Sequence, residues 1–171
     1  MSTVTFKNDT ICNMIGTEVN VGDVAPIVTV VNCDPMLKNE QIGGKVQLVS
    51  AVPSLDTATC DAETRRFNKE AASLDGVELV TVSMDLPFAA ARWCGAADIE
   101  NIKVCSDFRN KEFGNAYGVL LGDGPLAGLL ARVIFVIGKD GKVVYKQVVP
   151  EITAEPNYEE AIDAAKAAAK A

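Results

Sequence analysis

The chain has 171 residues, of which 49% are hydrophobic and 23% charged, with a formal net charge of -7 and no histidine. This length predicts one domain, residues 1–171, large enough to form a core without disulfide or metal staples. The absence of histidine excludes Ser-His-Asp and Cys-His catalytic sites, and sites that use imidazole as a base or metal ligand. The chemistry must therefore use thiols, carboxylates, hydroxyls, lysine, arginine or a bound cofactor.

The acidic balance and the hydropathy pattern limit the partners that we expect. Nucleic acids require a clustered basic surface, so no nucleic-acid partner is predicted. No membrane association is predicted either, because no run approaches the roughly 18 apolar residues of a spanning helix. The opening residues MSTVTFK predict no secretory signal, and five cysteines, an odd number, indicate a reducing compartment. We therefore expect a cytoplasmic protein.

The first half of the chain predicts strands followed by a helix. In chain order these are a hairpin (4–7 and 10–13, turn Asn8-Asp9), a strand (27–31), a loop (34–44), a strand (45–52) and a helix (58–74). The run at 45–52 is continuously apolar, which is typical of a strand buried on both faces. Phe67, Ala71 and Leu74 share one helical face, and Asp75-Gly76 is expected to end that helix.

The second half alternates strands with helices. The expected elements are a strand (78–83), a helix (87–94) that ends before Gly95, a strand (103–106), a helix (110–117), a hairpin (133–137 and 143–148) and a terminal helix (157–170). This alternation predicts an α/β protein with a mostly parallel sheet covered on both faces. The late hairpin adds antiparallel strands.

Of the five cysteines, Cys60 has the local context of a reactive thiol. The chain has no C-x-x-C pair, so neither a structural zinc site nor a thioredoxin-type dithiol is expected. Cys60 follows a buried strand, and either Asp56 or Thr57 as N-cap would place it in the first turn of a helix. A helix N-terminus stabilises a thiolate, and open α/β sheets carry reactive groups beyond the carboxyl ends of strands.

A thiolate at Cys60 also requires a local cation. Three carboxylates close in sequence oppose a second anion there, namely Asp56, Asp61 and Glu63. Arg132 is the candidate cation, because it interrupts the otherwise uncharged segment 126–137. Such an arginine either has a buried anionic or carbonyl partner or extends its head into solvent at the strand end, and the sequence leaves both open.

Several separated motifs resemble one family. Pro53-x-x-x-Thr57-x-x-Cys60 is similar to the active-site motif of the peroxiredoxins. Four segments resemble the bacterial thiol peroxidase branch of this family. They are 52–57, 85–89 with Arg92-Trp93-Cys94, 123–126 with Ala131-Arg132, and Ile152-Thr153-x-Glu155-Pro156. The resemblance covers essentially the whole chain. It implies a thioredoxin-like α/β fold with a mixed central sheet flanked by helices and an N-terminal β-hairpin.

The resemblance also implies roles for five residues. Cys60 resembles the peroxidatic cysteine, which becomes a sulfenic acid, and Cys94 the resolving cysteine, which forms an intrachain disulfide with it. Thr57 would position the thiolate and the peroxide, Pro53 would shield the pocket from water, and Arg132 would stabilise negative charge. Implied substrates are hydrogen peroxide and organic hydroperoxides. Thioredoxin is the implied reductant, with a homodimer as the assembly and no metal or cofactor.

The two implied partners lie on different predicted helices. A disulfide needs Cα atoms within about 7 Å, so one helix must move or unwind. The segment 87–94 is shorter than the roughly 12–15 residues of an independently stable helix, and Gly95 favours fraying at its end. Trp93, which is adjacent to Cys94, is expected to report this step by fluorescence.

The remaining cysteines have no expected role. Cys105 is predicted to lie in the core, and Cys12 and Cys33 to be partly exposed. Two other functions stay open from the residues alone: an oxidoreductase or chaperone acting on protein disulfides, and a redox-sensing module that uses a Cys60–Cys94 disulfide as a switch. Failure to consume peroxide would favour the first, and stoichiometric oxidation with capture of a partner would favour the second.

Overall fold

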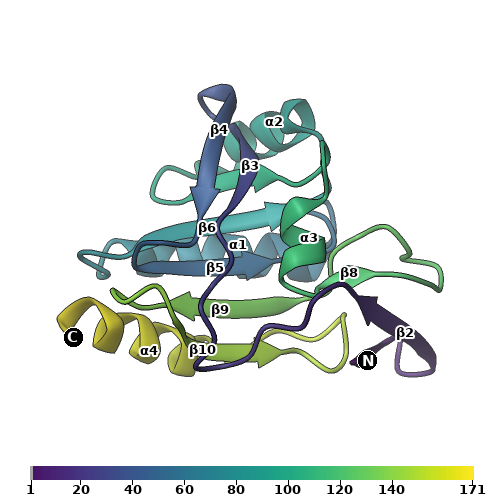
Figure 1. Cartoon of the computed structure of the whole chain (residues 1–171). Helices are drawn as coiled ribbons and strands as arrows, with labels where there is room; N and C mark the ends of the chain where they lie inside the picture. The colour runs from purple at the N-terminus through teal and green to yellow at the C-terminus, as the bar shows by residue number, and fades with distance from the viewer. Residues whose placement is uncertain (1) are drawn as a thin grey trace.

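The computed structural model describes residues 2–171 and contains a seven-stranded sheet. Its strands are β3 (Val28–Cys33), β4 (Met36–Ile42), β5 (Gln47–Ala51), β6 (Glu78–Ser83), β7 (Lys103–Ser106), β9 (Val133–Ile137) and β10 (Val143–Val148). Their order across the sheet is β10-β9-β5-β6-β7-β3-β4 (Figure 1). The pairs β5–β6 and β6–β7 are parallel, whereas β10–β9, β9–β5, β7–β3 and β3–β4 are antiparallel.

The mixed sheet confirms the fold class that the resemblance implies, and the expectation of a mostly parallel sheet is wrong. The unexpected antiparallel pairing involves β3 and β4 at one edge of the sheet. β4 lies within the stretch predicted as a loop, because its residues are mostly polar and show no apolar alternation. As the edge strand it exposes residues 36–39 to solvent, and an edge strand with one free side needs few apolar residues.

A smaller sheet consists of β1 (Thr3–Phe6), β2 (Thr10–Ile15) and β8 (Leu120–Leu121). It confirms the predicted opening hairpin, in which Phe6 pairs with Thr10. Lys7 and Asn8 in its turn have positive φ angles of 54° and 66°. The two-residue β8 is too short for any sequence periodicity to indicate it.

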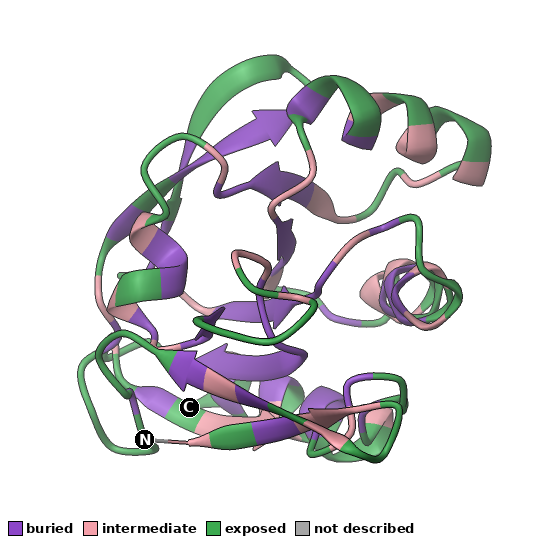
Figure 2. Ribbon diagram, turned by 90° about the vertical axis from the view of Figure 1, so that its right-hand side faces the viewer, coloured by how far each residue is buried: buried purple, intermediate pink, exposed green. Residues whose placement is uncertain are grey.

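Four helices cover the two faces of the main sheet, as expected: α1 (Ala58–Ala71), α2 (Pro87–Ala97), α3 (Glu112–Ala116) and α4 (Tyr158–Lys170). α1 and α4 bury Phe67 and Ile162 against β5, β6 and β9, and α2 packs by Ala90 on the same face. α3 and the small sheet cover the opposite face, where α3 lies in front of the strands in Figure 1. Figure 2 shows the central strands buried and the outer helix surfaces exposed.

Two helix ends differ from the expectation. α1 ends at Ala71, and Leu74 is buried in the turn that follows. α2 runs to Ala97 and ends at Asp98, whose φ of 53° and ψ of 46° are left-handed. Gly95 therefore lies inside α2, because alanines 96 and 97 are strong helix formers that extend it. The predicted end of this helix at residue 94 is wrong.

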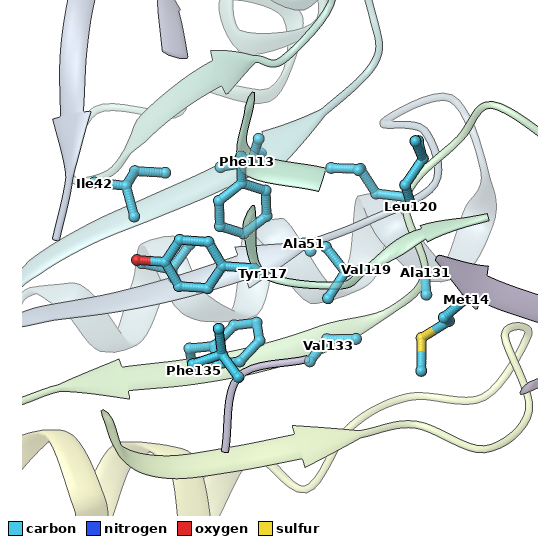
Figure 3. Close-up of a cluster of buried hydrophobic side chains, with 14 of the residues drawn as sticks. Met14, Ile42, Ala51, Phe113, Tyr117, Val119, Leu120, Ala131, Val133 and Phe135 are labelled. Atoms are coloured by element: carbon cyan, nitrogen blue, oxygen red, sulfur yellow. The ribbon is translucent and has the colours of Figure 1, made fainter. Parts of the chain in front are cut away.

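The core beneath α3 fixes β9, the strand that Arg132 directly precedes. Phe113 and Tyr117 stack with ring centroids 4.7 Å apart, and Tyr117 meets Phe135 edge-on at 5.2 Å (Figure 3). The Tyr117 hydroxyl donates a hydrogen bond of 2.7 Å to the Pro26 carbonyl, so its polar end is satisfied. Arg132 directly precedes β9 and is flanked by two fully buried residues of this core, Ala131 and Val133. Within residues 2–171, no helix has the length and apolar character that crossing a membrane would require.

Candidate active site

Cys60 lies in the first turn of α1, immediately beyond the carboxyl end of β5. Thr57 is the N-cap, and its Oγ1 accepts a hydrogen bond of 3.4 Å from the Cys60 backbone N–H. The same hydroxyl donates to the Ser54 carbonyl at 3.0 Å, which fixes its orientation. Cys60 itself is 0% exposed. The structure therefore selects Thr57 over Asp56 as the cap and confirms the predicted place of Cys60.

The loop between β5 and α1 is held by a carboxylate that the sequence analysis did not single out. Asp85, two residues after β6, accepts hydrogen bonds of 2.8 Å from the Ser54 hydroxyl, the Leu55 backbone N–H and the Ser83 hydroxyl. Pro53 is buried at the start of this loop. The signal available in the sequence was that Asp85 opens one of the segments resembling the family.

Arg132 places a guanidinium group against the Cys60 sulfur. Its Nη2 donates to the Cys60 sulfur at 3.3 Å, and its Nε donates to the Ile152 carbonyl at 2.9 Å. Its Nη1 lies 2.7 Å from the Glu63 carboxylate. The side chain is buried, so the alternative in which the head extends into solvent is wrong.

Glu63 is the anionic partner of Arg132. The sequence places it among the carboxylates that oppose a thiolate, and the structure shows it fully buried in an ion pair with Arg132. Its other oxygen accepts a hydrogen bond of 2.6 Å from Ser50. Glu63 is three residues after Cys60, so the two lie on one face of α1, and this spacing was the signal that identifies the anionic partner.

The electrostatic balance of the site keeps Arg132 charged. Burial by itself lowers the pKa of Arg132, but the Glu63 carboxylate and the Cys60 sulfur outweigh it and raise the pKa above its usual value. Burial raises the pKa of Glu63, and Arg132 and Ser50 counteract part of that effect. A cation fixed 3.3 Å from a sulfur at a helix N-terminus can stabilise a thiolate and the charge that develops during an attack by it.

The Asp61 carboxylate is turned away from this centre and occupied elsewhere. It pairs with Arg65 at 2.9 Å and accepts a hydrogen bond of 2.8 Å from the Trp93 indole N–H. The second contact joins α1 to α2 one residue away from Cys94. Within residues 2–171, no group of three or more cysteine, aspartate or glutamate side chains converges to hold a metal ion.

Cys94 is half-buried on α2, and its nearest sulfur partner is not Cys60. Its Sγ lies 3.8 Å from the Sγ of Cys33, and both are free thiols, as is Cys60. The contact with Cys33, aided by burial, raises the pKa of Cys94. The structure thus brings Thr57, Cys60 and Arg132 together, places Pro53 in the adjoining loop, and leaves Cys94 in a separate cluster.

The other cysteines are all buried. Cys105 is 1% exposed and lies in the core as predicted. Cys12 and Cys33 are 0% and 4% exposed, so the expectation of partial exposure is wrong for both. Cys12 is covered by the chain at Gly124, where an added Cβ would lie 3.1 Å from the sulfur, and Cys33 is covered by α2.

Comparisons with known proteins place this geometry in a family. Residues 16–162 match the protein family described as Redoxin. The thiol peroxidase of Halalkalibacterium halodurans is 51% identical over 170 residues, 98% of this chain and 99% of that protein. The thiol peroxidase of Bacillus subtilis is 48% identical over 171 residues, 99% of this chain and 100% of that protein. A peroxiredoxin-like protein from Aquifex aeolicus has a crystal structure that matches with a TM-score of 0.92 at 46% identity, covering 98% of this chain and 97% of that one. The chain therefore belongs to the redoxin family, within the thiol peroxidases of the peroxiredoxin type.

Proposed function

We propose that this peroxidase reduces hydrogen peroxide and organic hydroperoxides through a sulfenic acid at Cys60, which Cys94 resolves as an intrachain disulfide that thioredoxin reduces. The observation that carries the proposal is the 3.3 Å contact between the Arg132 guanidinium and the buried Cys60 sulfur at the start of α1. A thiolate nucleophile needs such a field, because the chain has no histidine to act as base.

In the first step the Cys60 thiolate attacks the terminal oxygen of the peroxide. The S–O bond forms as the O–O bond breaks, and the electron pair leaves on the other oxygen, which takes up a proton as alcohol or water. Arg132 stabilises the charge that moves from sulfur to oxygen, and its remaining contacts with Glu63 and Ile152 hold it in place. Thr57 fixes the turn around the sulfur, and the buried Pro53 limits access of water.

In the second step the Cys94 thiolate attacks the Cys60 sulfenic acid. The S–S bond forms, the S–O bond breaks, and hydroxide leaves and becomes water. Cys94 must leave its contact with Cys33, and that contact, together with burial, raises the pKa of the Cys94 thiol. α2 supports such a movement, because it has only 11 residues and includes Gly95 in its last turn.

The remaining parts of the proposal concern substrate and partners. Leu86 and Phe88 at the start of α2 are 53% and 62% exposed, which supports contact with the apolar part of an organic hydroperoxide. Thioredoxin as reductant, a homodimer and a cytoplasmic location stay predictions from the family resemblance and the cysteine count. Sedimentation analysis tests the dimer.

A peroxide-consumption assay with thioredoxin and thioredoxin reductase tests the catalytic roles. Wild type is compared with Cys60→Ser, Cys94→Ser and the control Cys12→Ser, which removes a fully buried thiol outside the site. We expect no consumption by Cys60→Ser, a stable sulfenic acid without thioredoxin-dependent turnover in Cys94→Ser, and wild-type turnover in the control. Retained turnover in Cys60→Ser would overturn the assignment.

A further inference from the structure

A second pair of sulfur atoms lies outside the Cys60 site and has no role in the steps above. Cys33 is the last residue of β3, and Cys94 lies on α2, which packs against that strand. Their Sγ atoms are 3.8 Å apart in the reduced protein. A disulfide has an S–S distance of about 2.05 Å, so closing this pair takes a shift of only about 1.8 Å at the sulfurs.

We propose that Cys33 is a third redox thiol, which exchanges with the Cys60–Cys94 disulfide to form a Cys33–Cys94 disulfide. Cys60 is released as a thiolate and can react with a second peroxide. The inference rests on the proposed function, because oxidation of Cys60 by peroxide supplies the two oxidising equivalents that the new disulfide holds.

The exchange is balanced without a further oxidant. The Cys33 thiolate attacks the Sγ of Cys94, the Cys33–Cys94 bond forms and the Cys60–Cys94 bond breaks. The electron pair leaves on the sulfur of Cys60, and the proton of the Cys33 thiol passes to solvent. One disulfide is lost and one is gained, so no net oxidation or reduction occurs in this step.

The surroundings of Cys60 favour this direction of exchange. The leaving sulfur returns to the Arg132 guanidinium and to the free N–H groups at the start of α1, which stabilise its negative charge. A leaving thiolate that is better stabilised departs faster in thiol–disulfide exchange. Cys94 in turn regains the neighbour that it has in the reduced structure.

The position of α2 links the exchange to the resolving step. Cys33 is buried beneath a cluster that includes Ala90, Ala91, Trp93 and Cys94 of this helix. When Cys94 moves toward Cys60, the cover over Cys33 is disturbed and its sulfur gains access to solvent. Ile99, which follows α2, packs in the same cluster, so Cys94 stays tethered within a few residues of Cys33.

The contact with Cys94 lowers the pKa of Cys33, although burial and Asp34 oppose that change. This contact exists only in the reduced pair, so the exchange depends on the proximity of the two sulfurs, which are 3.8 Å apart when Cys94 is in its reduced position.

The exchange moves the disulfide to a place beside two surface depressions. Cys33 and Cys94 both line a depression of about 530 Å³ beside β7, and both line a second depression of about 470 Å³ at the end of α2. The sulfur of Cys60 is instead enclosed by α1 and Arg132. A dithiol reductant can therefore approach the Cys33–Cys94 bond from the side of Cys94, which is half-buried.

The inference is tested by measuring how many equivalents of peroxide the protein consumes in the absence of a reductant. Reduced wild type receives one equivalent of hydrogen peroxide, and the disulfide is mapped by peptide mass spectrometry after alkylation. A second equivalent is then added together with dimedone, which captures sulfenic acids. We expect a Cys33–Cys94 disulfide after the first addition, full consumption of the second equivalent, and a dimedone adduct on Cys60.

Cys33→Ser and Cys33→Ala are expected to stop after one equivalent, with a Cys60–Cys94 disulfide and no adduct on Cys60. Cys105→Ser is the matched control, because Asn32, next to Cys33, pairs with Cys105 on the adjacent strand, and Cys105 packs into the core on the opposite face. It should behave as wild type.

Two results would overturn the inference, and they separate it from the proposed function. If wild type consumes the first equivalent, retains Cys60–Cys94 and leaves the second equivalent untouched, the exchange does not occur but the peroxidase steps stand. If the first equivalent is not consumed, both the proposed function and the exchange are wrong.

Discussion

The two sulfur sites of the molecule are built in opposite ways. Cys60 is fully buried, faces a charged guanidinium, and lies in a turn fixed by Thr57 and Asp85. Cys94 is half-buried on an 11-residue helix beside surface depressions, and its sulfur lies against the weakly polar thiol of Cys33. The difference follows from what each step requires. The attack on peroxide needs a charge field prepared in advance, whereas resolution needs a group that can move.

A substitution in the rigid site around Cys60 should have the largest effect on activity and stability. Arg132→Met removes the cation from Cys60 and leaves the buried Glu63 without its partner. Loss of one such charge-stabilising donor costs about 100-fold or more in rate. An unpaired buried charge costs about 3–5 kcal/mol in the free energy of unfolding. Peroxide kinetics and urea unfolding measure the two quantities separately.

A double variant separates these two consequences. Glu63→Leu combined with Arg132→Met removes both charges, and replacing a buried ion pair by apolar groups is often close to neutral for stability. We expect most of the stability to return while the activity stays lost. If the activity returned together with the stability, Arg132 would act only through the fold.

The cap of α1 should have a smaller effect. Thr57→Ala removes the side-chain oxygen that accepts from the Cys60 N–H, which lowers the free energy of unfolding by about 1 kcal/mol. Thr57→Ser keeps that oxygen and should unfold at nearly the wild-type urea concentration. Equal loss in both variants would show that the methyl group, rather than the hydroxyl, is what matters.

Stiffening α2, the helix that carries Cys94, should change only the resolving step. Gly95→Ala places a methyl group in open space inside α2 and should stabilise the helix by about 0.5–1 kcal/mol. If α2 must unwind, disulfide formation slows by up to about fivefold while sulfenic acid formation is unchanged. Trp93, whose indole donates to Asp61 across the two helices, should show this as a slower fluorescence phase. An unaltered slow phase would argue against unwinding at Gly95.

The smallest effect concerns the charges below the Cys33–Cys94 pair. Lys103 lies 2.9 Å from Glu40 and 2.6 Å from Glu78. Burial raises the pKa of each carboxyl, but the pKa of both is lowered, because Lys103 acts on both, with Asn32 and Lys38 at Glu40 and Lys45 at Glu78. A lowered carboxyl pKa contributes stability above its unfolded value of about 4.3, and that contribution is lost as pH falls.

Lys103→Met should therefore unfold more easily than wild type at pH 7, by no more than about 1 kcal/mol because the pairs are partly exposed. The difference should shrink as the pH falls below about 4. Urea unfolding of both proteins across this pH range measures it. A difference that grew toward low pH would have the wrong sign for these pairs.

The sequence predicted the rigid site around Cys60 better than the mobile site around Cys94. Cys60 and Thr57 follow from local rules, because a cap and a first turn depend on adjacent residues. Arg132 was found because a charge in an apolar segment requires a partner, but the identity of that partner, Glu63, depends on tertiary packing between α1 and β9. Local charge counting therefore does not show that Glu63 pairs with Arg132.

The surroundings of Cys94 were harder to predict for the same reason. Its neighbour Cys33 ends a strand whose partner, β4, is a polar edge strand without an apolar pattern. Because β4 has no recognisable pattern, nothing in the sequence places Cys33 beneath α2. The end of α2 was also misplaced, because Gly95 was treated as a terminus although the alanines after it continue the helix.

The central claim, that Cys60 is the sulfur prepared to attack peroxide, is tested most directly in Cys94→Ser. This variant receives one equivalent of hydrogen peroxide in the presence of dimedone, and the labelled peptides are identified by mass spectrometry. The structure predicts an adduct on Cys60 and none on Cys12, Cys33 or Cys105. An adduct on any other cysteine, with Cys60 unlabelled, would contradict it.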